Sequence, residues 1–214
     1  MTTKEVADIA AKMLSELGGE PAFLGYRGFP DVMCIAVNEE VQHTIPSTRV
    51  IKEGDTVNCD FGVLYKGLIT DAAITFPIGK ISFEAENLLA GTEAALNAAI
   101  KVVKHGVRVR DISKTIEKTL KAYGLGIVRE LCGHGVGHSL HEDPDIPNYG
   151  ADAGGTRLKA GMTIAIEPIA TVGRPEISFL PDGWNIITVD GKWAAQFEHS
   201  ILVTYEGCEI LTKV

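Results

Sequence analysis

The segment of residues 50–77 constrains the fold of this 214-residue chain more than any other part of its sequence. Residues 56–63 and 68–76 are rich in β-branched and aromatic side chains, which favour β-strands. The sequence Tyr65-Lys66-Gly67 between them offers a tight turn. The segment therefore predicts a β-hairpin.

Two aspartates lie on the predicted hairpin, one on each strand. With the turn centred between Tyr65 and Lys66, Asp60 would lie directly opposite Asp71, and opposed residues point to the same face of a sheet. Carboxylates placed side by side repel each other unless a proton or a cation lies between them. The hairpin therefore predicts a divalent metal site. A solvated hairpin face, or a register shifted by one residue, is the alternative.

The composition limits the class of protein. With 45% hydrophobic and 22% charged residues, the chain is typical of a soluble globular protein with one sizeable core. The net charge of -8, without a basic stripe in the sequence, argues against direct binding of nucleic acid. The N-terminus does not resemble a signal peptide, and no apolar run approaches the roughly 18 residues of a membrane span. We therefore expect one domain over residues 1–214, with no nucleic-acid or membrane partner.

The cysteines indicate the compartment. All four stand alone, without a CxxC pair: Cys34, Cys59, Cys132 and Cys208. Isolated cysteines are typical of reduced thiols in a reducing cytosol, because disulfides persist mainly in oxidising compartments. A cytoplasmic location is therefore expected.

Hydrophobic periodicity predicts three helices, over residues 3–17, 82–105 and 111–123, with Ser82 and Asp111 as the N-caps of the second and third. The apolar side of the first helix is expected to consist of Val6, Ile9, Ala10, Met13, Leu14 and Leu17. A strand is expected over residues 32–41, and strands with glycine-containing loops are expected from Ile127 onward.

A short internal repeat indicates a duplicated fold. Residues 52–60 reappear as residues 159–167, with matching Lys, Gly, Thr and β-branched positions and an acid at the end of each copy. Two unrelated turn-and-strand units could share the glycine and the apolar run by chance. They would not both need to end on an acid. We infer an α/β fold with two related halves, which bring Asp60 and Glu167 to a shared centre.

Residues 131–144 contain three histidines and three glycines in a short run. Glycines on both sides of His134 remove side chains, so that backbone and ligand can come close. Three histidines within eight positions favour a metal-binding or catalytic role, but the spacing does not say which histidine does what. Ordinary core or surface histidines are the alternative.

Two glutamates complete the set of candidate ligands. Glu167 lies in the apolar segment of residues 162–169, where an acid is rarely buried unless it is paired or bound to a cation. A carboxylate turned to water at the strand end is the alternative. Alternation along the last strand places Gln196 and Glu198 on one face and His199 on the other, so we assign Glu198 to the site.

The candidate ligands are four carboxylates and one imidazole: Asp60, Asp71, His134, Glu167 and Glu198. This set is too rich in oxygen for a structural zinc site, and its charge of about -4 is balanced by two divalent ions. Two ions about 3.5–4 Å apart would hold a hydroxide between them and polarise a carbonyl. The set is therefore typical of a hydrolase.

The chain resembles the type I methionine aminopeptidases from about Gly25 to the C-terminus. The matching stretches are Tyr26-Arg27-Gly28-Phe29-Pro30, Val37-Asn38-Glu39, His43, Ile45-Pro46, Val57-Asn58-Cys59-Asp60, Asp71, Cys132-Gly133-His134-Gly135-Val136-Gly137, His141-Glu142, Ile166-Glu167-Pro168, Asp182-Gly183-Trp184 and Gln196-Phe197-Glu198-His199. The resemblance implies a pita-bread fold of the α/β (α+β) class, with two pseudo-symmetric halves and a curved antiparallel sheet covered by helices. It also implies removal of the initiator methionine from nascent proteins whose second residue is small.

The resemblance implies a role for each ligand. Asp60 would bind one of two metal ions, and Asp71 and Glu198 would bridge both. His134 and Glu167 would complete the coordination of the other ion. Glu167 would also act as general base toward the bridging water. The metals that remain open are Co, Mn, Fe and Zn, because all four accept this ligand set.

The resemblance also implies how substrate is bound. His141 would donate a hydrogen bond to the scissile carbonyl as it becomes an oxyanion, and His43 would contact the substrate backbone near the cleaved bond. The methionine pocket would be lined by Tyr26, Phe29, Cys34, Leu140 and Trp184. An apolar slot with aromatic walls suits a flexible thioether. Ordinary core packing is the alternative, above all for Cys34 and Leu140.

Three features differ from the usual pattern of this family. The domain is expected to lack the extra N-terminal helix that the family usually carries. Gln42 and Thr44 flank His43 where Cys and Gly are usual, so Thr44 adds a side chain near the expected substrate site. Residues 138–140 read His-Ser-Leu in place of Arg-Gly-Phe.

Other functions remain open on the sequence. One is an Xaa-Pro peptidase of the same fold, such as a prolidase, which would be expected to carry a large additional N-terminal domain. The others are a non-catalytic peptide-binding or ribosome-associated relative, and a paralogue that binds metal but turns over poorly. The expected partners are a peptide or nascent-chain N-terminus as substrate and the ribosome, and the chain is expected to be a monomer.

Overall fold

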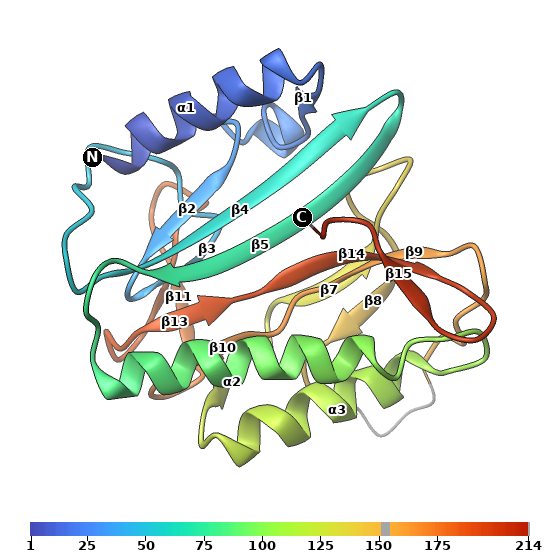
Figure 1. Cartoon of the computed structure of the whole chain (residues 1–214). Coiled ribbons are helices and arrows are strands. Elements are labelled where there is room, and N and C mark those ends of the chain that lie inside the picture. The colour runs from blue at the N-terminus through green and yellow to red at the C-terminus, as the bar shows by residue number, and fades with distance from the viewer. Residues whose placement is uncertain (151–154, 214) are drawn as a thin grey trace.

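A computed structural model describes residues 1–150 and 155–213 of the chain, and within these ranges a nine-stranded antiparallel sheet forms the centre of the fold (Figure 1). Its order is β1-β4-β5-β14-β9-β7-β8, with β2 beside β4 and β15 beside β14. Two three-stranded sheets, β13-β10-β6 and β11-β12-β3, accompany it. The strands are β1 (Glu20–Pro21), β2 (Cys34–Val37), β3 (Glu40–Gln42), β4 (Thr56–Tyr65), β5 (Leu68–Pro77), β6 (Gly126–Ile127), β7 (Cys132–Gly135), β8 (Glu142–Pro147), β9 (Thr163–Ile166), β10 (Ile169–Thr171), β11 (Ile177–Phe179), β12 (Ile186–Thr188), β13 (Ala194–Gln196), β14 (Glu198–Val203) and β15 (Cys208–Ile210).

The helices lie over the large sheet, with α1 (Thr3–Glu16) above β2 and β4 and with α2 (Phe83–Ile100) and α3 (Val109–Ala122) packed together below (Figure 1). One apolar core joins α2 and α3 to β9 and β14, and a smaller one joins α1 to β2 and β4. A short 3-10 helix, η1 (Tyr26–Gly28), lies in the loop after β1. Neither α1, α2 nor α3 is long and apolar enough to cross a bilayer.

The predicted N-caps are half right. The Ser82 hydroxyl accepts a hydrogen bond from the backbone N–H of Ala85 at 3.2 Å, so Ser82 caps α2 as predicted. Asp111 is not the cap of α3. The helix begins at Val109, and the Asp111 carboxylate lies in its first turn, where it accepts from the backbone N–H of Arg108 at 3.3 Å. An acid at this position reaches back to the N-cap residue, which explains why the sequence pattern resembled a cap.

The predicted apolar face of α1 is wrong in part. Ile9, Met13 and Leu17 are 48%, 56% and 79% exposed, whereas Ala7 and Leu14 are buried. A small residue such as Ala7 lets the helix backbone come close to the sheet, and this contact fixes which side of the helix faces inward. Ile9, Met13 and Leu17 therefore point away from the core, whereas Leu14 faces it as predicted.

The hairpin of β4 and β5 forms as predicted, but its register differs by two residues from the predicted one. The turn centres on Lys66 and Gly67, whose φ angles of 50° and 81° are left-handed, as in a type I′ turn. Asp60 consequently pairs with Ala73, not with Asp71. Because side chains alternate with a period of two, an even shift keeps both aspartates on the same face, as diagonal neighbours.

The internal repeat has the same local structure in both copies. Gly54 and Gly161 have the same left-handed φ of 94°, and in each copy the following residue donates its backbone N–H to the carbonyl oxygen of Lys52 or Lys159. The turn then leads into β4 in the first half and β9 in the second. The two strands deliver Asp60 and Glu167 to the same region of the sheet, as the duplication predicts.

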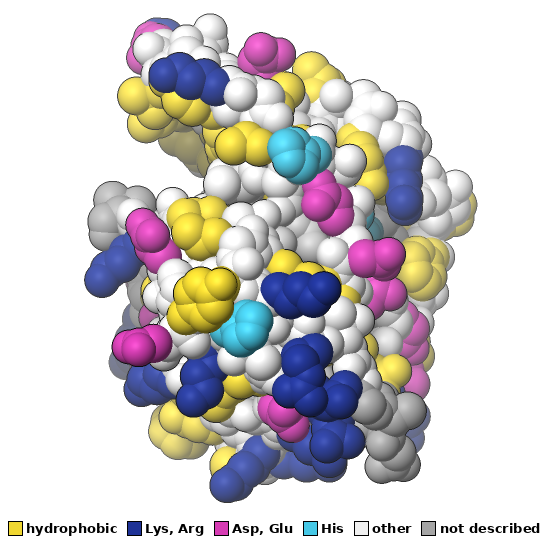
Figure 2. Space-filling model, turned by 90° about the vertical axis from the view of Figure 1, so that its right-hand side faces the viewer, with side chains coloured by type: hydrophobic (Ala, Val, Ile, Leu, Met, Phe, Trp, Pro, Cys, Tyr) yellow, Lys and Arg dark blue, Asp and Glu magenta, His cyan; other side chains and the backbone are white. Residues whose placement is uncertain are grey.

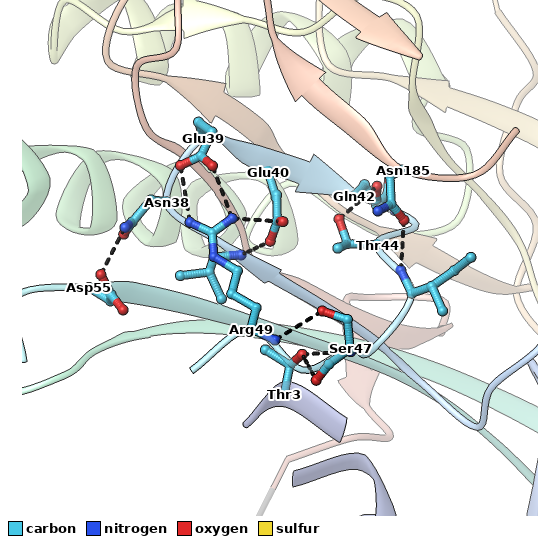
Figure 3. Close-up of polar contacts among 12 residues, drawn as sticks. Thr3, Asn38, Glu39, Glu40, Gln42, Thr44, Ser47, Arg49, Asp55 and Asn185 are labelled. Atoms are coloured by element: carbon cyan, nitrogen blue, oxygen red, sulfur yellow. Dashed lines mark hydrogen bonds and ion pairs between the residues drawn. The ribbon is translucent and has the colours of Figure 1, made fainter. Parts of the chain in front are cut away.

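The strand predicted for residues 32–41 is two strands, because Asn38 takes a left-handed φ of 57° between β2 and β3. Figure 3 shows what fixes this bend: the Arg49 guanidinium lies between the carboxylates of Glu39 and Glu40, at 2.9 Å and 2.7 Å. Glu40 lies at the start of β3, which pairs with β12.

Charge is distributed unevenly over the surface. Residues 101–118 and 157–159 carry eight of the 20 Lys and Arg residues and only two acids. Gly106 donates its backbone N–H to the Leu158 carbonyl at 2.9 Å, so the two segments are adjacent. Lys and Arg side chains gather accordingly in the lower part of the face in Figure 2. Six of these eight residues lie in residues 101–118, so most of the cluster is already present in the linear sequence, and Arg157 and Lys159 join it through the fold.

The cysteines agree with the prediction of unpaired thiols. Cys34, Cys59, Cys132 and Cys208 are all free in the structure, with Cys34 buried and the other three partly buried.

The hairpin turn yields a test of the register. Substitution Gly67→Ala should lower the free energy of unfolding by about 1–2 kcal/mol, because a side chain in the left-handed region clashes with its own backbone. Urea denaturation would measure it. Gly207→Ala is the matched control, since Gly207 has no left-handed φ and a Cβ there meets no atom within 4 Å. Equal stabilities for the two variants would contradict the turn geometry.

Candidate metal centre

All twelve side chains predicted for the site line one cavity of about 220 Å³ on the inner face of the large sheet. They are Tyr26, Phe29, Cys34, His43, Asp60, Asp71, His134, Leu140, His141, Glu167, Trp184 and Glu198. The structure therefore brings together residues from both halves of the chain. Their separate roles stay predictions.

Strand pairing places three of the acids side by side. Asp60 on β4 and Glu198 on β14 both pair with Ala73 of β5, from opposite sides, and Asp71 lies two residues away on the same face of β5. The Ser200 hydroxyl accepts from the Asp71 backbone N–H and donates to its carbonyl, both at 2.8 Å, which ties β5 to β14 at this point. Alternation along these strands therefore directs all three carboxylates into the cavity.

The second half of the chain adds an imidazole and a fourth carboxylate. His134 Nε2 lies 3.9 Å from Asp71 Oδ2 and 3.7 Å from Glu167 Oε1. Ligand atoms of Asp71, His134 and Glu198 all lie within 4.8 Å of one another. These separations are too long for direct hydrogen bonds, but they leave room for an ion between the groups.

The tautomer of His134 follows from its surroundings. Its Nδ1 lies 2.8 Å from the carbonyl oxygen of Gly135, which can only accept, so Nδ1 carries the proton. Burial lowers the pKa of His134, so the ring is neutral. The lone pair of Nε2 therefore faces the carboxylates, as a metal ligand requires.

The four carboxylates are buried, each no more than 4% exposed. Burial raises the pKa of Asp60 to about 7. Burial, reinforced by repulsion from neighbouring carboxylates, holds the pKa values of Asp71, Glu167 and Glu198 well above their usual range. Four such groups cannot all be ionised in one cavity unless positive charge balances them.

Unpartnered oxygens show that the residues fit a metal. Asp60 Oδ1 and Glu198 Oε1 are buried and have no hydrogen-bond partner among the described residues. Buried acceptors of this kind are normally satisfied by a donor, a water or a cation. Carboxylate and imidazole ligands together suit divalent ions such as Mn²⁺, Fe²⁺, Co²⁺ and Zn²⁺.

The glycines next to His134 have a different purpose from the predicted one. A Cβ at Gly133 would lie 2.4 Å from the Ala165 carbonyl oxygen, and one at Gly135 would lie 2.4 Å from the Asp143 carbonyl oxygen. The glycines are needed because the backbones next to β7 pass too close for a side chain. They position His134 by close strand packing and do not make room for a ligand.

An apolar cluster forms the other wall of the cavity. Phe23, Phe29, Cys34 and Leu140 are buried together, with Tyr26 and Trp184 packed against them. The rings of Phe29 and Trp184 meet edge to face, with centroids 5.1 Å apart. The residues predicted for a methionine pocket are therefore contiguous, and they adjoin the carboxylates.

Two further histidines border the cavity. His141 Nδ1 lies 2.9 Å from the Tyr26 hydroxyl, and its ring stacks on that of Tyr26. Burial lowers the pKa values of His43 and His141 to about 4, so both are neutral near pH 7 and can each donate one hydrogen bond. His199 lies apart, with Nδ1 2.8 Å from the Thr212 hydroxyl, as alternation predicted.

Sequence reasoning missed several side chains of the site. The cavity is also lined by Phe23, Arg27, Gln42, Glu130, Leu131 and Cys132. Gln196, which shares a face with Glu198, donates to two of the carboxylates. The strand face that Gln196 shares with Glu198 was the only feature of the sequence that indicated its place in the site. Thr44 is buried but does not line the cavity, so its side chain takes no room from a substrate there.

No feature of the sequence indicated that Gln42 lines the cavity. In a regular strand, Gln42 and His43 would point to opposite faces. His43 has a left-handed φ of 56°, which breaks the alternation, so both side chains reach the cavity.

Comparisons with known proteins agree with this geometry. Residues 1–205 match metallopeptidase family M24. The chain is 44% identical to methionine aminopeptidase 1 of Bacillus subtilis over 214 residues, covering 100% of this chain and 86% of the relative. A methionine aminopeptidase crystal structure from Thermotoga maritima is similar with a TM-score of 0.97 and 43% identity, over 100% of this chain and 86% of that one.

A prolidase structure from Pyrococcus furiosus is also similar, with a TM-score of 0.80 and 27% identity, but this chain covers only 56% of it. The likeness to these structures confirms the predicted pita-bread fold.

Buried carboxylates make the stability of the metal-free protein depend on pH. Their pKa values are higher in the folded state than the usual value of about 4, so the folded state binds more protons, and stability should fall as pH rises from about 4 to about 7. Glu198→Gln should stabilise the metal-free protein at neutral pH by about 1–4 kcal/mol. Denaturation in EDTA would measure both effects. Glu209→Gln, which changes an exposed glutamate, is the control and should have no effect. Loss of stability in Glu198→Gln under these conditions would contradict the proposed repulsion.

Proposed function

The chain belongs to metallopeptidase family M24, and we propose that it is a methionine aminopeptidase, which removes the N-terminal methionine from peptides and nascent proteins whose second residue is small. The observation that carries this proposal is the contact between a carboxylate–imidazole cluster and an apolar, aromatic pocket within one cavity. The cluster suits metal-dependent hydrolysis, and the pocket suits an unbranched thioether side chain. Identity of about 40% or more to several methionine aminopeptidases over the whole chain supports the same conclusion.

We propose that the cluster holds two divalent ions. Asp60 would bind one ion, His134 and Glu167 the other, and Asp71 and Glu198 both. Bound ions would supply an activated water and polarise the scissile carbonyl. The unpartnered oxygens of Asp60 and Glu198 support this assignment, and so does the free lone pair of His134 Nε2. Mn, Fe, Co and Zn all accept this ligand set.

The protein's own groups bind the substrate and move the proton. Glu167 would take a proton from the attacking water and pass it to the leaving amine. His141 would donate a hydrogen bond to the carbonyl oxygen as negative charge develops there. His43, on the rim near Trp184, would contact the substrate backbone. The aromatic cluster would exclude water from the methionine side chain.

An Xaa-Pro peptidase is the second candidate, because prolidases share the fold. Lower identity and coverage favour it less than a methionine aminopeptidase. A non-catalytic or poorly active relative is less well supported, since all five expected ligands are present and meet in one cavity. The free cysteines support a cytoplasmic location. A single catalytic domain, a monomeric state and an encounter with the ribosome stay predictions.

Peptide specificity tests the proposed function. With Mn²⁺ or Co²⁺, the protein should release methionine from Met-Ala-Ser, cleave Leu-Ala-Ser about 10–100-fold more slowly, and leave Ala-Pro intact. EDTA should abolish activity, and added metal should restore it. Chromatography of the released amino acids would measure the rates. Preferential cleavage of Ala-Pro would instead identify an Xaa-Pro peptidase, and inactivity with every metal would identify a non-catalytic relative.

The role of His141 gives a second test. His141→Ala should lower kcat on Met-Ala-Ser by on the order of 10² to 10³, because one donor to the developing oxyanion is lost, while metal content stays the same. Steady-state kinetics and metal analysis would measure the two quantities. His105→Ala, which changes an exposed histidine near Tyr205, is the control. Loss of metal in His141→Ala would make His141 a ligand and would require a different role for His134.

A further inference from the structure

Two buried amides hold the same oxygen of Glu167. Gln42 Nε2 donates a hydrogen bond to Glu167 Oε2 at 3.0 Å, and Gln196 Nε2 donates to the same atom at 3.2 Å. Gln42 is 6% exposed and Gln196 is fully buried, so neither contact competes with bulk water. The orientation of both amides is fixed, because the reverse orientation would place an amide oxygen against a carboxylate oxygen.

The two amides leave Glu167 with one free oxygen. A carboxylate oxygen has two lone pairs, and two donors occupy both lone pairs of Oε2. The other oxygen, Oε1, faces the cluster and lies 3.7 Å from His134 Nε2. Oε1 is therefore the only oxygen of Glu167 that can bind an ion without breaking a buried hydrogen bond.

Gln42 reaches Glu167 from a separate part of the fold. Gln42 lies on β3, which belongs to the small sheet with β11 and β12, whereas Glu167 directly follows β9 of the large sheet. Gln42 pairs with Ile186 of β12, and the ion pairs of Arg49 with Glu39 and Glu40 fix the preceding bend (Figure 3). Gln196 comes from a third direction, since its backbone is held by the Thr75 hydroxyl of β5. The carboxylate is thus held by amides from two different elements, β3 and the end of β13.

A neutral donor suits this position. The cavity already holds four carboxylates, so another acid would add repulsion, and a Lys or Arg would itself occupy the place of a cation. An amide satisfies one carboxylate oxygen without changing the charge that is left for metal ions. The amide oxygen of Gln42 has no hydrogen-bond partner among the described residues, so the side chain is directed by its amide nitrogen, which donates to Glu167.

We propose that Gln42 is a positioning residue of the metal centre, which acts with Gln196 to hold Oε2 of Glu167 so that this carboxylate binds an ion through Oε1 alone. The inference rests on the metal site of the proposed function, but not on its substrate. Groups that orient metal ligands from outside contribute to metal affinity, and their loss typically weakens it 10–100-fold.

Metal binding to the metal-free protein tests the proposal without an activity assay. Gln42→Met keeps the length of the side chain and removes its donor. Isothermal titration with Mn²⁺ should give a dissociation constant about 10–100-fold higher than that of the unchanged protein. The visible absorption spectrum of bound Co²⁺ should also change, because Glu167 would no longer be restricted to one oxygen. A purely structural role of Gln42 would lower the melting temperature of the metal-free protein and leave the spectrum unchanged.

Two further variants keep the test decisive. Gln42→Asn retains the amide but is one methylene shorter, so it cannot reach Glu167 and should weaken Mn²⁺ binding in the same way. Thr44→Val is the matched control, because Thr44 is buried next to Gln42 and its hydroxyl is 3.5 Å from the Gln42 carbonyl, away from Glu167. This variant should bind Mn²⁺ like the unchanged protein.

Three outcomes would overturn the inference. If folded Gln42→Met and Gln42→Asn bind Mn²⁺ within twofold of the unchanged protein, Gln42 does not position Glu167. If Thr44→Val weakens binding equally, the effect belongs to the strand and not to the amide. If the unchanged protein binds no Mn²⁺, Co²⁺, Fe²⁺ or Zn²⁺, the metal centre itself fails, and the proposed function fails with it.

Discussion

The structure depends on holding four buried carboxylates in one cavity. Asp60, Asp71, Glu167 and Glu198 repel one another, and burial adds to the cost of ionising each of them. The other polar groups of the site add no further negative charge to this arrangement. They are a neutral imidazole and uncharged amide donors, and some carboxylate oxygens are left without partners. Such a cluster lowers stability unless cations neutralise it, which agrees with the proposed metal site.

Strand geometry determines which side chains enter the cavity. The period of two along β4, β5 and β14 sends three acids to one face, and Asp60 and Glu198 approach Ala73 from its two sides. Close backbone packing beside β7 then brings His134 to the same place, and this packing is possible only because its neighbours are glycines. Two departures from regular strand geometry add the remaining polar groups. The left-handed φ of Asn38 ends β2, and that of His43 lets Gln42 and His43 both face inward.

The two halves of the fold contribute unequally to the site. Their repeated turn and strand deliver Asp60 and Glu167 in the same way, with the same backbone angle at the glycine. The first half adds most of the apolar wall, including Phe29 and Cys34. The second half adds Leu140 and Trp184 to this wall, and it also supplies the imidazole and the amide of Gln196. A duplicated scaffold thus places one carboxylate from each half at the centre, and residues outside the repeat make one side polar and the other apolar.

The sequence by itself determined the chemical character of the site and most of its elements. The five candidate ligands, the hairpin, the three helices and the repeat follow from residue type, period and spacing, which are local properties of the chain. The tertiary structure decided the rest: the register of the hairpin, the buried side of α1, and the contact of Gln42 with Glu167. These features depend on left-handed backbone angles at single residues, or on contacts between segments far apart along the chain. A local pattern carries no information about either, because both are fixed only when the elements pack.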